Sequence, residues 1–119
     1  MTNDNGLPEP VEAYIRAINA GDSDGLRSTF AQDAVVNDVG REFRGIAAIE
    51  EWAREEIFDV SVSLDVMNVV ERHGEIVVTV QIDGTFDRTG LPDPLLMDHG
   101  FTVVGRKIAS LTCRLPPTQ

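Results

Sequence analysis

Apolar residues near the start of the chain recur at the spacing of an α-helix. They occupy positions i, i+3, i+4 and i+7 of one stripe, namely Val11, Tyr14, Ile15 and Ile18. Pro8 and Pro10 suit the beginning of a helix, and Gly21 suits a C-terminal cap because glycine adopts a left-handed backbone without strain. The pattern predicts a first helix that ends at Gly21 and buries one side.

Two further helices are predicted before the long strands begin. Asp22 or Ser23 can cap a short second helix. A third covers Ile46 to Ile57, and its inward face is formed by Ile49, Trp52, Ala53 and Ile57. Between them, the segment DAVVNDVGREFRG predicts a pair of short strands with a turn near residues 38–40.

The second half of the chain alternates apolar and polar residues with the period of a β-strand. In VSVSLDV, the apolar side chains are Val60, Val62, Leu64 and Val66. Hairpin turns are predicted near residues 73–75 and near Gly105, so that four long strands follow the helices. Helices and antiparallel strands that are segregated along a chain indicate an α+β fold.

The composition places the whole chain in one globular domain. Its 119 residues are 42% hydrophobic, and we expect a loose lead-in over residues 1–7 and a tail over residues 116–119. No apolar run approaches the ~20 residues that span a bilayer, and the first residues do not resemble a secretory signal. The single cysteine suits a reducing compartment, so a cytoplasmic protein is expected.

Charge limits the partners of such a domain. Twenty acidic residues against ten basic ones give a formal net charge of −10, which repels phosphate backbones and anionic membranes. Two histidines and one cysteine make a structural zinc site improbable. A neutral hydrophobic small molecule suits this balance better, and we expect no nucleic acid, membrane, metal or cofactor.

The long strands carry apolar residues on both faces, as shown by Ile76 and Val78 on one side and Val77 on the other. One face can cover the helices. A second copy of the chain is the simplest cover for the other face, so the pattern predicts a homodimer packed through the sheet.

A longer stretch is more specific than these patterns. The segment YIRAINAGDSDGLRSTFAQDAVVNDVGREFRGIAAIEEW, residues 14–52, resembles the nuclear transport factor 2-like (NTF2-like) superfamily and its SnoaL-like branch. Within it, the closest functional resemblance is to Δ5-3-ketosteroid isomerase, over about Val11 to Leu115. The resemblance implies a cone-shaped curved antiparallel sheet wrapped around three N-terminal helices, with a ligand pocket between them. It also implies that dimers are usual.

Three residues match catalytic positions of the isomerases. Tyr14, in EAYIRAINAGD, matches the tyrosine that hydrogen-bonds the steroid carbonyl oxygen. Asp38, in VVNDVG, matches the aspartate that carries the proton, and Asp98, in LMDHGF, matches the second carboxyl group of the oxyanion hole. The resemblance therefore implies a proton shuttle in which Asp38 is the base and Tyr14 and Asp98 stabilise the enolate oxygen.

This role of Asp98 sets a physical requirement. A carboxyl group donates a hydrogen bond only when protonated, and protonation above pH 7 needs a pKa raised by about three units, roughly 4 kcal/mol. Burial beside Met97 and Phe101 can supply that shift, because desolvation disfavours the anion. The arrangement is that of ketosteroid isomerase itself, so the family supplies its magnitude. His99 alternates to the other face and is expected at an interface or in solvent.

Apolar residues from several predicted elements are candidates for lining the pocket. They are Phe30, Trp52, Phe58, Met67, Val80, Ile82, Phe86 and Met97. Tyr14 is the only tyrosine, whereas some isomerases support this residue with further tyrosines, so the departure bears on the substrate. An arginine between two acids, the pattern of limonene-epoxide hydrolases, has only a weak match in Arg88 beside Asp87.

Three functions stay open at this point, and the sequence does not decide whether the protein is an enzyme. The first is isomerase-like proton transfer on a hydrophobic carbonyl compound, which predicts Tyr14, Asp38 and Asp98 converging on one cavity. The second is a cofactor-free SnoaL-like cyclase that uses an aspartate in acid–base chemistry. The third is a non-catalytic binding protein, which predicts a pocket without convergent polar groups.

Overall fold

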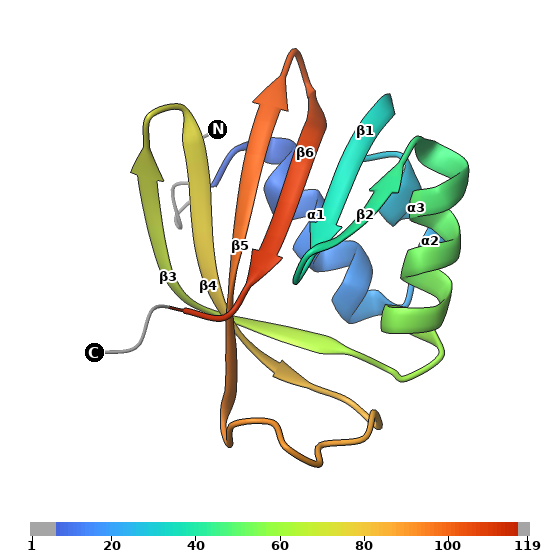
Figure 1. Ribbon diagram of the computed structural model, residues 1–119. Coiled ribbons are helices and arrows are strands. Elements are labelled where there is room, and N and C mark those ends of the chain that lie inside the picture. The colour runs from blue at the N-terminus through green and yellow to red at the C-terminus, as the bar shows by residue number, and fades with distance from the viewer. Residues whose placement is uncertain (1–6, 117–119) are drawn as a thin grey trace.

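The computed structural model describes residues 7–116, and its elements follow the predicted order (Figure 1). They are α1 (Glu9–Ala20), α2 (Ser23–Arg27), β1 (Phe30–Asp38), β2 (Arg41–Arg44), α3 (Ile46–Ala53), the π-helical turn η1 (Arg54–Phe58), β3 (Ser63–Arg72), β4 (Glu75–Asp83), β5 (Leu95–Val104) and β6 (Lys107–Arg114). The predicted lead-in, apart from Leu7, and the tail beyond residue 116 lie outside the described residues.

Local chemistry sets the end of α1 and the start of α2. Gly21 adopts a φ of 69°, and its N–H donates to the carbonyls of Ala17 and Ile18. Asp22 caps α2 by accepting a hydrogen bond from the N–H of Gly25 at 2.9 Å. The predicted stripe of α1 is its buried side, so the first two helices are confirmed.

The strands form one six-stranded sheet in the order β2-β1-β6-β5-β4-β3. Neighbouring strands are antiparallel except β1 and β6, which run parallel. The parallel pair arises because the last strand of the meander from β3 to β6 returns beside β1 in the same direction. The α+β class is confirmed, and the sheet departs from the antiparallel expectation at this one pair.

The helices lie on one side of the sheet, and the sheet curves around them (Figure 1). Buried side chains of α1, α3 and the inner sheet face form one core, which includes Val11, Ile49, Phe101 and Leu111. The lower parts of β3, β4 and β5 extend past this core, together with the loop that joins β4 to β5. Among residues 7–116, no helix has both the length and the apolar character needed to cross a bilayer.

Side chains alternate between the two faces along β5, and this alternation positions the site. Leu95 and Met97 line a cavity on the helix side, and His99 and Phe101 contact Tyr14 of α1. The residues between them belong to the outer face of the sheet; they are Leu96, Asp98, Gly100 and Thr102.

Candidate functional site

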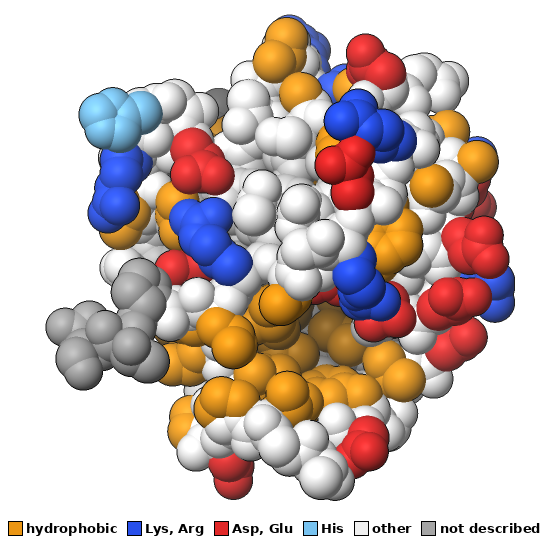
Figure 2. Space-filling view, viewed as in Figure 1, with side chains coloured by type: hydrophobic (Ala, Val, Ile, Leu, Met, Phe, Trp, Pro, Cys, Tyr) orange, Lys and Arg blue, Asp and Glu red, His pale blue; other side chains and the backbone are white. Residues whose placement is uncertain are grey.

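A cavity of about 520 Å³ lies between the inner sheet face, α1, η1 and the β4–β5 loop. Figure 2 shows it as a hollow lined by hydrophobic side chains, with charged side chains along its edge. Its apolar lining includes Ile18, Ile57, Leu64 and Leu95. The size and lining suit a small organic ligand, since such pockets are typically a few hundred Å³ and mostly apolar.

Tyr14 reaches the cavity from the buried stripe of α1. Its ring packs edge-on against Phe30 and Phe101, with centroid distances of 6.1 and 5.1 Å, so its orientation is held by the core. Burial raises the pKa of the Tyr14 hydroxyl well above its usual value, and the nearby Cys113 and Asp38 add to the effect. The hydroxyl therefore keeps its proton at neutral pH and can donate a hydrogen bond.

Asp38 stands at the end of β1, before the turn of Val39 and Gly40 that leads into β2. Its Oδ2 accepts hydrogen bonds from Trp52 Nε1 at 3.1 Å and from the Arg41 guanidinium at 2.9 Å. Within residues 7–116, both side-chain donors use Oδ2, which leaves Oδ1 as the oxygen to face a ligand. A mostly buried, oriented carboxylate at the cavity wall is a suitable group for moving a proton.

Arg41 lies between two acids at the cavity mouth. One of its terminal nitrogens donates to Asp38 at 2.9 Å and to Glu56 of η1 at 3.2 Å. The hydrogen bond to Glu56 is the main cause that raises the pKa of Arg41. The two-residue turn after Asp38 pairs Arg41 with it across the β1–β2 hairpin, so the sequence around the turn carried a signal for this contact.

His99 lies on the inner face of the sheet, so its expected position at an interface or in solvent is wrong. Its Nδ1 is 3.4 Å from the Tyr14 hydroxyl oxygen, and only 6% of the residue is exposed. Burial lowers the pKa of His99 to about 4, although the charges of Asp38 and Asp98 act in the opposite direction. The imidazole is therefore neutral at pH 7, and it lines the cavity.

Asp98 does not line the cavity, and the expectation that it joins Tyr14 there is wrong. It is on the outer face, where its Oδ1 accepts a hydrogen bond from Thr79 Oγ1 at 2.6 Å. Its cross-strand neighbour is Arg114, which pairs with Glu75 at 4.0 Å. The physical reason is strand alternation: because Met97 and Phe101 face inward, the inward residue between them is His99.

A profile of SnoaL-like domains matches residues 11–111 of the chain. The chain belongs to the SnoaL-like domain family. Its fold is NTF2-like, and the resemblance drawn from residues 14–52 is confirmed.

Solved structures with the same fold have varied names. This SnoaL-like domain is 29% identical to a candidate polyketide cyclase from Sinorhizobium meliloti, with a TM-score of 0.81 over 91% of this chain and 95% of that one. A candidate ketosteroid isomerase from Kribbella flavida is 14% identical, with a TM-score of 0.73 over 92% and 77%. A Mycobacterium tuberculosis protein in complex with estradiol-17β-hemisuccinate is also 14% identical, with a TM-score of 0.73 over 87% and 88%.

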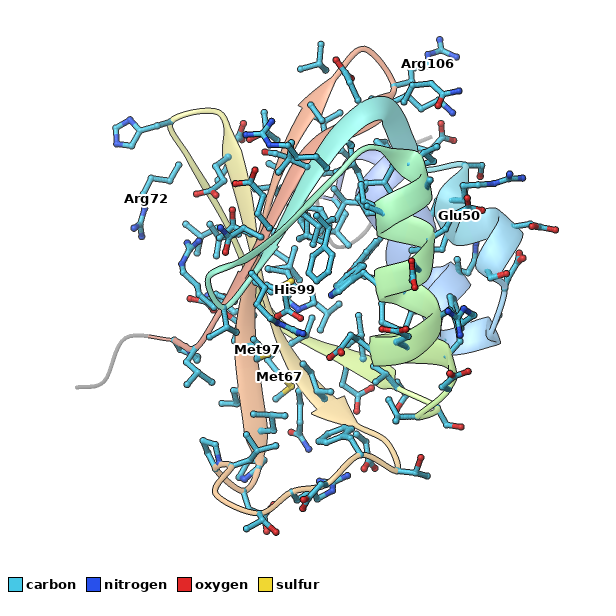
Figure 3. The ribbon with its side chains drawn as sticks, turned by 45° about the vertical axis from the view of Figure 1, so that its right-hand side comes forward. Glu50, Met67, Arg72, Met97, His99 and Arg106 are labelled. Carbon is cyan, nitrogen blue, oxygen red and sulfur yellow. The ribbon has the colours of Figure 1, made fainter. Side chains whose placement is uncertain are left out.

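Several predicted lining residues of the SnoaL-like domain do line its cavity. They are Trp52, Ile82, Phe86 and Met97. Phe30 and Val80 do not, because they are buried in the core beside it, and Phe30 packs on the ring of Tyr14. Figure 3 shows His99 and Met97 close together on β5.

Two other predicted lining residues of this SnoaL-like domain lie elsewhere. Phe58 ends the π-helical turn and lines a different hollow, next to α2 and α3. Met67 is 57% exposed, because the β3–β4 register shifts between Val66 and Asn68 and leaves it without a cross-strand partner. In both cases an irregular backbone turns the side chain away from the position that a regular period predicts.

Sequence reasoning also missed Cys113 of this SnoaL-like domain, which lines the cavity opposite His99 on β6. Burial is the main cause that raises the pKa of its thiol, and the charge of Asp38 adds to it. The thiol therefore stays protonated and serves as part of the apolar wall. Leu111 and Cys113 are two residues apart on β6, so strand alternation places both side chains on the same buried face, and this spacing was the available signal.

Proposed function

We propose that this SnoaL-like protein binds a neutral hydrophobic carbonyl compound and moves a double bond next to its ketone, with Asp38 carrying the proton. The main support is that Tyr14, Asp38 and His99 line the same mostly apolar cavity. A purely non-catalytic pocket has no need for both a carboxylate and a protonated phenol in one ligand site.

The proposed reaction needs one base and one oxygen-binding group. Asp38 Oδ1 takes a proton from the carbon beside the ketone; the C–H electron pair becomes the enolate double bond, and the carbonyl π pair moves to oxygen. Hydrogen-bond donation from the side of the cavity where Tyr14 and His99 are in contact stabilises that oxygen. Asp38 then returns the proton to a different carbon, and the double bond ends conjugated with the ketone.

The arrangement around Asp38 suits this shuttle. Trp52 and Arg41 hold Oδ2, so the carboxylate keeps its orientation while Oδ1 moves the proton. The apolar wall gives the hydrocarbon body of a ligand a dry surface, which strengthens the polar contacts at its end. Two proteins with the same fold support a steroid-like ligand, since one is a candidate ketosteroid isomerase and the other was solved with a steroid ester.

A cyclase-type reaction is the second candidate. It is favoured by the relative at 29% identity, which is a candidate polyketide cyclase. Such a reaction also removes a proton beside a carbonyl group, so Asp38 keeps its role and the substrate differs. A larger, more oxygenated substrate would place further polar groups against the rim residues Arg41 and Glu56.

We also propose that two copies associate through the outer face of the sheet and that the protein acts in the cytoplasm. The outer face of β5 combines Leu96 with the half-exposed polar neighbours of Asp98, a mixture that a symmetric partner can cover. Cys113 is a buried free thiol, which a reducing compartment preserves. Light scattering after size exclusion would give the mass, and a monomer at micromolar concentration contradicts the dimer.

The direct test is an absorbance assay with a β,γ-unsaturated 3-ketosteroid. Wild type is expected to produce the absorbance of the conjugated enone. Asp38→Asn should lower kcat by about 10²- to 10⁴-fold, because the amide cannot accept the proton. Asp65→Asn, which removes the same charge from an exposed position on β3, is the matched control and should keep wild-type activity. Equal inactivity of folded wild type and Asp38→Asn contradicts the isomerase proposal.

A further inference from the structure

We propose that the imidazole of His99 is the inner hydrogen-bond donor to the oxygen of the ligand, and that Tyr14 acts through it. In this arrangement the Tyr14 hydroxyl donates to Nδ1, which leaves the proton of the ring on Nε2. The inference rests on the proposed function for the kind of ligand, whereas the assignment of the ring proton is independent of any ligand.

The first step concerns the one proton between the two groups. Tyr14 Oη and His99 Nδ1 are 3.4 Å apart, close enough to share a single hydrogen bond. Either Nδ1 carries a proton and donates to the phenol, or the phenol donates to a bare Nδ1. A phenol O–H is much the more acidic donor, and an imidazole nitrogen is much the more basic acceptor. The pairing therefore favours the phenol as donor.

The second step concerns the ionisation of both groups. Titratable groups face His99 from three elements, namely Tyr14 of α1, Asp38 of β1 and Cys113 of β6. Asp98, the preceding residue of β5, lies on the other face of the sheet. β4 contributes only Val78 opposite it. Burial outweighs the two carboxylates, so the ring is neutral, and burial also keeps the phenol protonated. A neutral ring that accepts at Nδ1 must donate at Nε2.

The third step concerns what the donor can bind. Both rings are in contact with the cavity, and Asp38 is on its wall. A ketone oxygen that accepts a hydrogen bond from Nε2–H would leave the carbon beside the ketone within the same cavity as the Asp38 carboxylate. No protonated carboxyl group is then needed to bind the oxygen. Unlike a protonated carboxyl group, a neutral imidazole keeps this proton when the pH rises through 7. Ligand affinity should therefore stay level from about pH 6 to pH 9.

The test without ligand uses nitrogen NMR on ¹⁵N-labelled wild-type protein at pH 7. Long-range proton–nitrogen correlations report which ring nitrogen of His99 carries the proton, and exposed His73 serves as an internal standard of rapid tautomer exchange. A bare Nδ1 and a protonated Nε2 are expected. Tyr14→Phe should remove this preference. A protonated Nδ1 in wild type overturns the inference, whether or not the protein has any activity.

The test with ligand uses 4-androstene-3,17-dione, a conjugated 3-ketosteroid, and a pair of amide variants. The side-chain amide of His99→Gln reaches the place of Nε2, whereas that of His99→Asn reaches only the place of Nδ1. His99→Gln should therefore bind at least about fivefold more tightly than His99→Asn. Equal affinities for the two variants overturn the inference. If no variant and no wild type binds the steroid while Nε2 carries the proton, the proposed carbonyl ligand fails and the donor assignment stands.

Discussion

Two neighbouring residues of β5 show how the inner and outer faces of this sheet differ. Asp98 and His99 are almost equally buried, with 9% and 6% exposed. Asp98 is buried among polar groups, with Thr79 donating to it and Arg114 across the strand. His99 is buried between the rings of Tyr14 and Phe101 and the cavity, and Tyr14 is its hydrogen-bond partner. Burial alone therefore says little about a role, because the surroundings decide what the buried group does.

The same contrast extends across the sheet. The inner face meets the helices through large apolar side chains, and few polar groups of the sheet line the cavity. The outer face carries an ion pair of Glu75 and Arg114 over Gly100, whose missing side chain leaves room for them. We therefore expect substitutions on the inner face to change both stability and ligand binding, and those on the outer face to change stability alone.

The largest effect should come from truncating the inner core. Phe101→Ala removes a fully buried ring that packs on Tyr14, and should lower the free energy of unfolding by about 4 kcal/mol. Thr102→Ala, one residue along on the outer face, is the control and should change it by less than about 0.5 kcal/mol. Chemical denaturation measures both. Similar losses for the two variants would contradict the assignment of faces along β5.

The next largest effect is a dependence of stability on pH. The unfolded state protonates His99 near pH 6.5, whereas the folded state does so only near pH 4. The stability that comes from keeping this ring neutral is therefore fully present above pH 6.5 and is lost as the pH falls toward 4. The loss is about 3 kcal/mol relative to a variant that does not titrate.

Urea denaturation of wild type and His99→Gln from pH 7.5 to pH 4 measures this loss. The difference in the free energy of unfolding between the two proteins should change across that window. His73→Asn, in the exposed turn between β3 and β4, is the control, and its free energy of unfolding plotted against pH should be parallel to that of wild type. Parallel curves for wild type and His99→Gln would mean that His99 is not buried as a neutral ring.

A smaller effect is expected on the outer face. Thr79→Val removes the hydroxyl that donates to Asp98 and leaves that carboxyl group short of a partner, so the free energy of unfolding should fall by about 1–2 kcal/mol. Steroid affinity and turnover of the folded protein should not change. Tyr14→Phe is the inner-face counterpart, and it should weaken ligand binding more than it weakens stability. Loss of turnover in folded Thr79→Val would place the outer face in the site.

The smallest effect on stability is expected at the cavity mouth. Arg41 is half exposed, so Arg41→Gln should change the free energy of unfolding by less than about 1 kcal/mol, despite its contacts with Asp38 and Glu56. Its effect on turnover should be larger, because Asp38 loses one of the two donors that orient it. Arg72→Gln is the matched control, because Arg72 is the last residue of β3 and does not line the cavity (Figure 3). Equal turnover in the two variants would show that Arg41 does not position Asp38.

Part of the candidate site could be predicted because its signals are local. The helical stripe places Tyr14 on the buried side of α1 and the turn residues place Asp38 at the end of β1, whereas only the resemblance implied that both line the pocket, as they do. The resemblance implies Asp98 at the cavity, but Met97 and Phe101 face inward, so strand alternation makes His99 the inward residue between them. The catalytic roles of Tyr14 and Asp38 stay predictions until turnover is measured.

The sequence by itself determined the helices, the turns, the order of the strands along the chain and the family, since periodicity, caps and turn residues act over a few positions. Only the tertiary structure decided which face of β5 is inner, where β3 bulges, and that residues 14 and 99 meet although 85 positions separate them. These features depend on which distant elements pack together. The free energy of that packing belongs to contacts between segments, and no single segment encodes it.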